Sequence, residues 1–225
     1  MIADGVRIGP TERLLPGPGI PADLRLGRSN NNLDVVEVGG VRFLALRTSW
    51  IHFASPWTRI VVLRSHDRGA TWTTDLVIDR RRDLREPRFL ALDGRLLLYF
   101  FEAGTNPFAF QPGRVFATAR PLGTDDADWS RPVPVSEEDT VVWRTKWLGD
   151  RPVMVRYRGG GDSYARGEAD MAGGVWTTRG GFFWRPPAPA PPARRRRPRH
   201  RARRPGAPRP ARHNAARARA RRRAR

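Results

Sequence analysis

The chain of 225 residues contains no cysteine and a single lysine, Lys146, beside 41 arginines. The absence of cysteine excludes disulfide bonds and thiolate metal sites. No apolar run approaches the roughly 18 residues that a membrane-spanning helix needs, and the N-terminus lacks the charged and apolar regions of a secretory signal. We therefore expect a protein that does not associate with a membrane and that is located in the cytoplasm.

Acidic residues are absent from residues 185–225, which hold 17 arginines and consist of only six residue types. This segment supplies most of the net charge of +20, since residues 1–184 hold 25 basic and 22 acidic residues. A segment of this composition has little apolar surface to bury and is predicted to be disordered. Its arginines would bind polyanions non-specifically, which leaves a nucleic-acid or acidic-surface binder as one alternative function. The segment lacks the interleaved aromatic residues that single-strand binders use.

The composition of this tail has a further explanation at the level of the gene. Arg, Ala and Pro are encoded mostly by GC-rich codons, and the change of composition is abrupt. Our leading hypothesis is a shift of reading frame after about codon 172. Translation of the other frames beyond that point should then reveal further β-hairpins, and their absence would contradict the hypothesis.

A hairpin pattern recurs along the chain before the tail. Turns at Gly39-Gly40, Asp93-Gly94 and Gly149-Asp150 each separate two runs of strand-forming residues, at spacings of 54 and 56 residues. A period of about 50 residues with four short strands per unit is typical of β-propeller blades. The predicted strands are 33–38, 41–48, 58–64 and 72–78 in blade one, 87–92, 95–102, 113–119 and 129–134 in blade two, and 142–148, 151–158, 173–178 and 182–185 in blade three.

These patterns predict an all-β fold in three parts. Residues 1–32 form an irregular lead-in with little core, and residues 33–184 form a partial six-bladed β-propeller of about three four-stranded blades. Residues 185–225 form the disordered basic tail.

One turn carries a specific motif, Ser65-His66-Asp67-Arg68-Gly69-Ala70-Thr71-Trp72. Short polar side chains can bond backbone N–H groups within such a turn, glycine supplies a positive φ, and the tryptophan is a buried anchor. The pattern Ser-x-Asp-x-Gly-x-Thr-Trp resembles the Asp-box of the sialidase superfamily of β-propellers. The resemblance implies a structural role for Ser65, Asp67, Gly69, Thr71 and Trp72. Residues 177–184 resemble an altered copy in which Arg179 replaces the aspartate.

The connectivity of a propeller blade places the loop before its first strand and the loop between its second and third strands on one face, and the Asp-box on the other. The resemblance to sialidases implies that arginines on the first face bind a substrate carboxylate. Arg28 and Arg47 stand near two such positions, although Arg28 is not in the family's Arg-Ile-Pro setting. Further residues predicted on this face are the substrate-binding candidates Arg85, Arg88 and Arg144 and the catalytic candidates Glu86 and Glu102.

The loop 48–57 contains no carboxylate where the family has its acid/base aspartate, and His52 is its only titratable residue. The resemblance therefore implies a glycoside hydrolase scaffold of the exo-α-sialidase type that is truncated and inactive as this chain. Its expected partner is a glycan, sialylated or otherwise acidic. The alternative is a non-catalytic glycan- or protein-binding propeller. Neither a cofactor nor a metal is predicted, since His52 and His66 stand without clustered partners, and the oligomeric state stays open.

Overall fold

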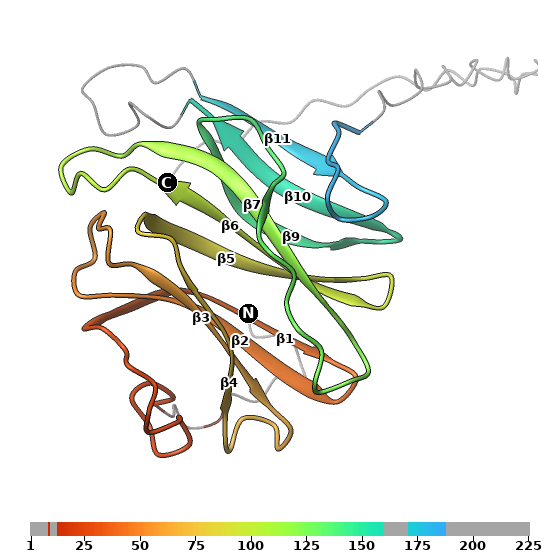
Figure 1. Cartoon of the computed structure of the whole chain (residues 1–225). Coiled ribbons are helices and arrows are strands. Elements are labelled where there is room, and N and C mark those ends of the chain that lie inside the picture. Colours follow the sequence, from red (N-terminus) through yellow and green to blue (C-terminus); the bar gives the residue numbers. More distant parts are fainter. Residues whose placement is uncertain (1–8, 10–12, 160–170, 188–225) are drawn as a thin grey trace, which may run out of the picture. The chain divides into compact units, whose positions relative to one another are not determined.

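The computed structural model describes Gly9, residues 13–159 and residues 171–187, and none of these residues is helical. Within them, strands form three antiparallel sheets (Figure 1). The first sheet has β1 (Ser29–Val38), β2 (Val41–Ser49), β3 (Arg59–Ser65) and β4 (Thr73–Asp79); the second has β5 (Asp83–Leu92), β6 (Arg95–Ala103), β7 (Pro112–Pro121) and β8 (Val133–Pro134); the third has β9 (Thr140–Leu148), β10 (Arg151–Arg158) and β11 (Ala172–Thr177). In the part of the chain that is described, no helix is long and apolar enough to cross a membrane. The tail from residue 188 onward lies outside the described residues.

The predicted all-β repeat is confirmed in all three sheets. Hairpins β1–β2, β5–β6 and β9–β10 turn at the three predicted positions, and each sheet continues outward in chain order. The turn residues adopt the left-handed conformation that tight hairpins need, with φ of 60° at Gly39, 70° at Gly94 and 62° at Gly149. The runs of strand-forming residues and the turns that separate them therefore determine the strand pairing.

The outer strands depart from the predicted pattern in blades two and three. The fourth strand of blade two is only β8, because Pro132 and Pro134 lack the N–H groups that a longer ladder would use. The described residues show no strand at 182–185, where a single bridge joins Thr177 to Arg185. The chain turns there at Gly181, and Trp184 packs edge-on against Tyr99 of β6 with ring centroids 5.6 Å apart.

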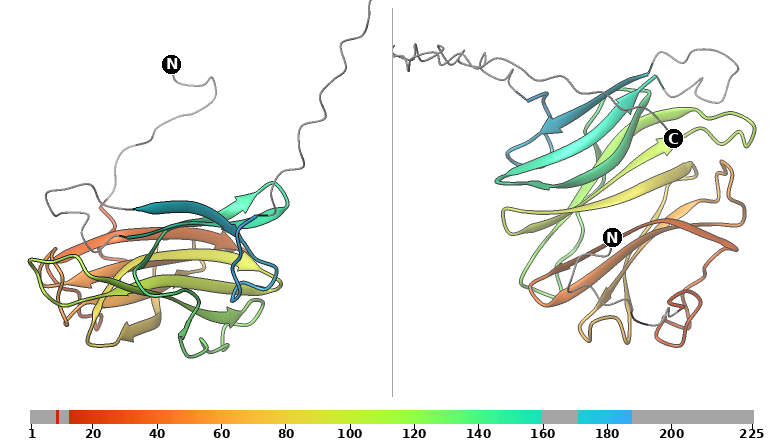
Figure 2. Two further views of the ribbon diagram at one scale, coloured as in Figure 1. Left: turned by 90° about the horizontal axis from the view of Figure 1, so that it is seen from above. Right: turned by 180° about the vertical axis from the view of Figure 1, so that it is seen from behind.

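The sheets pack face to face around two apolar layers. One layer joins the first two sheets and includes Phe43, Ile60, Phe89 and Phe100, and the other joins the second and third sheets. Strands β1, β5 and β9 are consecutive neighbours, with β5 between the other two (Figures 1 and 2). The first strand of each sheet is thus the strand that faces its counterparts in the adjacent sheets.

The lead-in contributes more to the core than the sequence predicts. Leu15, Ile20, Leu24 and Leu26 pack against the free face of the first sheet, over an apolar cluster that includes Trp72. No described residue before Ser29 belongs to a strand, so the segment is irregular as expected. Its spaced leucines nevertheless find an apolar surface, which a composition rich in Gly and Pro does not reveal.

The turn between β3 and β4 is closed by its own side chains. Asp67 accepts hydrogen bonds from the Thr71 backbone N–H at 2.9 Å and the Thr71 hydroxyl at 2.6 Å. Gly69 has φ of 98° and donates its N–H to Ser65 Oγ at 2.7 Å. Trp72 is 6% exposed and donates its indole N–H to the Gly69 carbonyl at 3.0 Å. These contacts hold the turn compact without help from a ligand.

The altered copy keeps part of this arrangement. Trp184 is 8% exposed and donates its indole N–H to the Gly181 carbonyl at 3.1 Å. Gly181 donates its N–H to Thr178 Oγ1 at 2.9 Å. The tryptophan–glycine contact therefore persists although Arg179 stands where the first motif has its aspartate.

Candidate functional site

The loops that join β2 to β3 (50–58) and β6 to β7 (104–111) lie at the end of the sheets opposite the turn 65–72. The register requires this placement, because Thr48 pairs with Arg59 at one end of β2 and Arg42 pairs with Ser65 at the other. The starts of β1 and β5 lie at the same end as the two loops. We call this end of the sheets the loop face.

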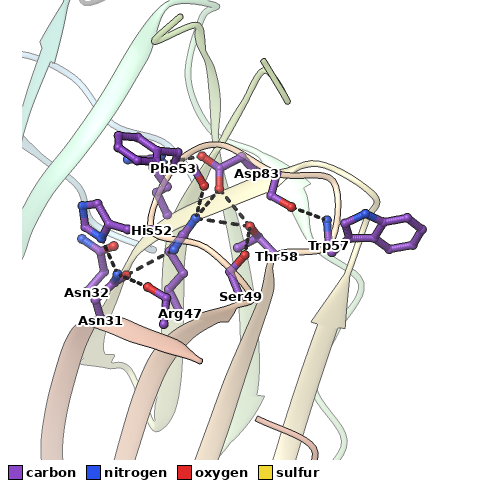
Figure 3. Close-up of polar contacts among 12 residues, drawn as sticks. Asn31, Asn32, Arg47, Ser49, His52, Phe53, Trp57, Thr58 and Asp83 are labelled. Carbon is purple, nitrogen blue, oxygen red and sulfur yellow. Dashed lines mark hydrogen bonds and ion pairs between the residues drawn. The ribbon is translucent and has the colours of Figure 1, made fainter. Parts of the chain in front are cut away.

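A buried ion pair forms the centre of the loop face (Figure 3). Arg47 on β2 and Asp83 at the start of β5 are both completely buried, with Arg47 Nη2 2.9 Å from Asp83 Oδ1. The Thr58 hydroxyl donates to the same carboxylate oxygen at 3.0 Å. Arg47 also donates to the Phe53 carbonyl at 3.0 Å, and Arg85 pairs with the other oxygen of Asp83. Burial lowers the pKa of Arg47, and the charge of Asp83 opposes that effect.

This network ties the first two sheets together through residues far apart in the sequence. Arg47 was predicted to bind a substrate carboxylate, but the carboxylate that it contacts in the structure is Asp83 of the protein itself. Beside it, Asn31 Nδ2 lies 2.9 Å from His52 Nδ1, which positions the only titratable side chain of the loop. The main effect of this network is therefore to anchor the loop 50–58.

Glu86 lies at a β-bulge of the strand that starts beside this network. Its backbone has φ of 51°, and the register of β5 against β6 shifts at this point. One carboxylate oxygen bonds to Asn32 of β1 and the other to Arg88. Burial raises the pKa of Glu86, while the positive charges of Arg88, Arg85 and Arg144 act in the opposite direction. A carboxyl group with a raised pKa is suited to donate a proton.

Three charged residues occupy one repeated position, five residues before each hairpin turn: Asp34, Arg88 and Arg144. Asp34 accepts the Phe89 N–H at 2.7 Å, and its other carboxylate oxygen lies 3.6 Å from Arg144 Nη1. Arg88 is 6% exposed and donates to the Trp143 carbonyl at 2.8 Å. Side chains at this position thus link the adjacent strands β1, β5 and β9. Burial raises the pKa of Asp34, against its hydrogen bond to Phe89 and the charges of Arg88 and Arg144.

A hollow of about 320 Å³ opens where the two loops meet. Its lining includes His52 and Phe53 from one loop, Phe108 and Phe110 from the other, and Arg85. The Arg85 guanidinium lies 5.8 Å from the centre of the Phe110 ring. Apolar rings beside a guanidinium offer both a surface for a sugar ring and a partner for its oxygen atoms.

The remaining predicted site residues are Glu102 and Arg28. Glu102 near the end of β6 forms an ion pair with Arg80 and is 14% exposed at its side chain. Arg28 is exposed, and its guanidinium has no hydrogen bond or ion pair with the described residues. The structure therefore brings Arg47, Arg85, Glu86 and Arg88 into one connected region. Among the described residues, no side-chain hydrogen bond or ion pair joins Glu102 or Arg28 to this region, although the backbone of Glu102 pairs with Leu84 of β5.

Sequence reasoning missed Asp83 and Asp34. The strand was predicted to start at residue 87, whereas β5 starts at Asp83, a position where nothing local distinguishes it from a loop residue. Asp34 could have been found from the repeat, because it shares a position with Arg88 and Arg144. Among the described residues no group of histidine and acidic side chains could hold a metal ion.

The sequence matches no family model and no curated protein. The structure is similar to Trypanosoma rangeli sialidase, with a TM-score of 0.53 and 13% identity, over 72% of this chain and 30% of that one. Its complex with 2,3-difluorosialic acid, a covalent intermediate, gives a TM-score of 0.52 with 13% identity over the same shares of the two chains. A mutant α-L-arabinanase of Cellvibrio cellulosa is less similar, with a TM-score of 0.45 and 12% identity, over 70% of this chain and 54% of that one.

These similarities show that the described sheets have the fold of a sialidase-like β-propeller. The predicted all-β, partial propeller is confirmed at this level. The chain spans about 30% of the length of the sialidase structures that it resembles.

Proposed function

We propose that this chain is a glycoside hydrolase scaffold of the exo-α-sialidase type that binds an acidic glycan but does not hydrolyse it on its own. The observation that supports the proposal is the connected region of Arg47, Asp83, Arg85 and Glu86 beside an aromatic hollow on the loop face. Sugar sites commonly combine aromatic rings with a few convergent polar groups.

In this proposal Arg85 contacts the glycan, because among the described residues it is the one arginine that lines the aromatic hollow. Its side chain is 20% exposed, whereas the side chain of Arg47 is 1% exposed. Arg47 and Asp83 then act as positioning residues that hold Arg85 and the loop 50–58 in place. Arg28, Arg88 and Arg144 are proposed to provide additional contacts with the glycan.

The absence of hydrolysis follows from the carboxylates that are available. Glycoside hydrolysis requires a general acid and a nucleophile or base at a fixed separation. Most families use two carboxyl groups, whereas sialidases use a tyrosine as the nucleophile, so a free acid/base carboxyl group is needed in either case. Glu86 has the raised pKa of a candidate acid, yet both of its oxygens have protein partners. Glu102 is paired with Arg80, and the loop 50–58 has no carboxylate.

The test is to measure binding and turnover separately. Binding of sialyllactose to the full chain is measured by ligand-observed NMR, and turnover is measured with a fluorogenic sialoside. Arg85→Ala should weaken binding, whereas Arg131→Ala on the exposed loop between β7 and β8 is the matched control, since it leaves the tail and the loop face unchanged. Hydrolysis by the native chain would contradict the proposed inactivity, and equal binding by the two variants would contradict the assigned site.

The alternative is a propeller that binds glycans or proteins and has no catalytic role in any context. The pairing of Asp83, Glu86 and Glu102 with arginines favours it, because these carboxylates are occupied by structural contacts. Glu86→Gln and Glu102→Gln distinguish the two readings in a protein that carries the additional blades. Loss of turnover in either variant supports a hydrolase, and unchanged glycan binding with no turnover in any form supports the alternative.

A further inference from the structure

Two tryptophans at the ends of the loop 50–58 are exposed to solvent. Trp50 is 63% exposed and Trp57 is 58% exposed, although most of the large apolar side chains of the first sheet are buried. Figure 3 shows Trp57 projecting to the side of the loop that is opposite His52. Exposed aromatic groups gathered in one place commonly mark a binding site.

The backbone that carries these tryptophans is held firmly. Ala54, Ser55 and Thr58 are buried, and Thr58 bonds to Asp83 as described above. The Trp57 N–H bonds to Ser55 Oγ at 3.2 Å. An anchored loop presents its side chains at a small entropic cost on binding, which favours a preformed site.

A cavity of about 410 Å³ is lined by both tryptophans together with Arg25, Gly27, Ser49 and Arg59. It shares no lining residue with the hollow at Arg85. The lead-in can form its wall because Gly27 has no side chain: a Cβ there would lie 2.1 Å from the Ser49 carbonyl oxygen. The cavity volume falls within the roughly 300–1,000 Å³ of small-molecule sites.

The described lining of this cavity carries only positive charge, whereas the centre of the loop face is an ion pair of opposite charges. None of the described residues that line it is acidic, although Arg25 and Arg59 both contribute to it. The Arg59 guanidinium also donates a hydrogen bond to the Arg25 carbonyl oxygen, and neither side chain forms an ion pair with a described residue. The carboxylate opposite Arg59 in the strand register, Asp79, lies instead 3.9 Å from Arg81. Arg81, which pairs with Asp79, lies over the Trp57 ring at 4.6 Å and so covers one face of that ring.

We propose that this cavity is a second carbohydrate site, separate from the aromatic hollow, that binds a uronic acid residue of an oligosaccharide. Trp50 and the face of Trp57 that Arg81 leaves uncovered take the C–H surface of the pyranose ring. The carboxylate of the sugar pairs with Arg25 and Arg59, whose guanidinium geometry matches a carboxylate. The uncompensated positive charge selects an anionic sugar, and the two rings select a sugar over a small anion.

The experiment titrates digalacturonate into the full chain and follows tryptophan fluorescence and ligand-observed NMR. About 0.3 M sodium chloride screens contacts with the arginine-rich tail, which is the same in every variant. Trp50→Ala and Trp57→Ala should each weaken binding about tenfold, the loss expected for one aromatic contact. Arg25→Gln should weaken binding of digalacturonate and leave the unfolding temperature unchanged, since Arg25 is exposed.

Two controls distinguish this site from the rest of the molecule. Trp147→Ala removes a tryptophan of β9 that is 45% exposed, and Arg85→Ala alters the hollow of the proposed glycosidase site. Neither should affect binding of digalacturonate, so failure of the proposed function and failure of this site give different results. Unchanged affinity in Trp57→Ala overturns the proposal, as does equal binding of cellobiose, stronger binding of a sulfated disaccharide, or self-association of the chain that Trp57→Ala abolishes.

Discussion

Replacing Asp83 by Asn should strongly destabilise the protein. The side chains of Arg47 and Asp83 are 1% and 0% exposed, so the charge of Arg47 has little access to water. Asp83 accepts hydrogen bonds from Arg47 at 2.9 Å and from Thr58 at 3.0 Å, and it also pairs with Arg85. The amide of asparagine would preserve the shape but turn one acceptor into a donor that faces a guanidinium.

The size of the effect follows from the burial of Arg47. Removing one partner of a buried ion pair costs about 3–5 kcal/mol, because the remaining charge is uncompensated. Total stabilities of about 5–15 kcal/mol make this a large fraction of the free energy of unfolding. With a urea m-value of about 1–3 kcal/mol/M, the midpoint should fall by at least about 1 M.

The assay is urea unfolding followed by tryptophan fluorescence and circular dichroism. Glu37→Gln is the control, since its ion pair with Arg42 has side chains that are 52% and 34% exposed, and such a pair contributes about 0–1 kcal/mol. The double variant Arg47→Met with Asp83→Leu removes both charges and should recover much of the lost stability. A loss below about 1 kcal/mol in Asp83→Asn would refute the reasoning, because the pair would then be solvated despite its burial.

Three further substitutions test other parts of the structure. Burial raises the folded pKa of Asp34 above 3.8, so the stability of the native protein relative to Asp34→Asn should fall as the pH rises from 3.8 through the folded pKa. Urea unfolding of both proteins between about pH 3 and 8 measures this difference. A difference that does not change with pH would contradict the prediction. Hydrogen bonds from Thr71 lower the folded pKa of Asp67 below 3.8, so the stabilisation that the Asp67 carboxylate provides is present above that pH and is lost in acid. Asp67→Asn should therefore melt at a lower temperature than the native protein at neutral pH, and the difference should shrink on acidification. A difference in melting temperature that stays constant with pH would contradict this prediction. Gly27→Ala should cost about 1–3 kcal/mol in urea unfolding because its Cβ would lie 2.1 Å from the Ser49 carbonyl oxygen, and an unchanged midpoint would show that the lead-in moves away freely.

The hairpins and their order could be predicted from the sequence because their signals are local. Short apolar runs on either side of a turn such as Asp93-Gly94 depend only on residues that are close together in the chain. The predictions failed where a distant contact decides the outcome. Residues 182–185 form no strand in the described structure, because Trp184 packs on Tyr99 of another sheet. The lead-in covers the first sheet for a similar reason, since its leucines act only once that sheet exists.

The candidate site was predicted only as a set of residues on one end of the sheets. Chain connectivity brings Arg47, Arg85, Glu86 and Arg88 to that end, and the strand register agrees. The pairing of their charges was not predictable, because Asp83 is 36 residues from Arg47 and resembles a loop residue in the sequence. An arginine that is paired with a carboxylate of the protein is not free to contact a sugar. The sequence-based prediction therefore assigned more arginines to ligand binding than the structure leaves available.

By itself the sequence determined the all-β class, the period of the sheets and the turn at 65–72, since each depends on residues close together in the chain. Only the tertiary structure decided that Arg47 is enclosed with Asp83 while Trp50 and Trp57 remain exposed. The physical reason is that the packing of the sheets, and not the residue type, determines which side chains are buried. A guanidinium enclosed with a carboxylate stabilises the fold, and one without a carboxylate beside exposed rings is available to a ligand.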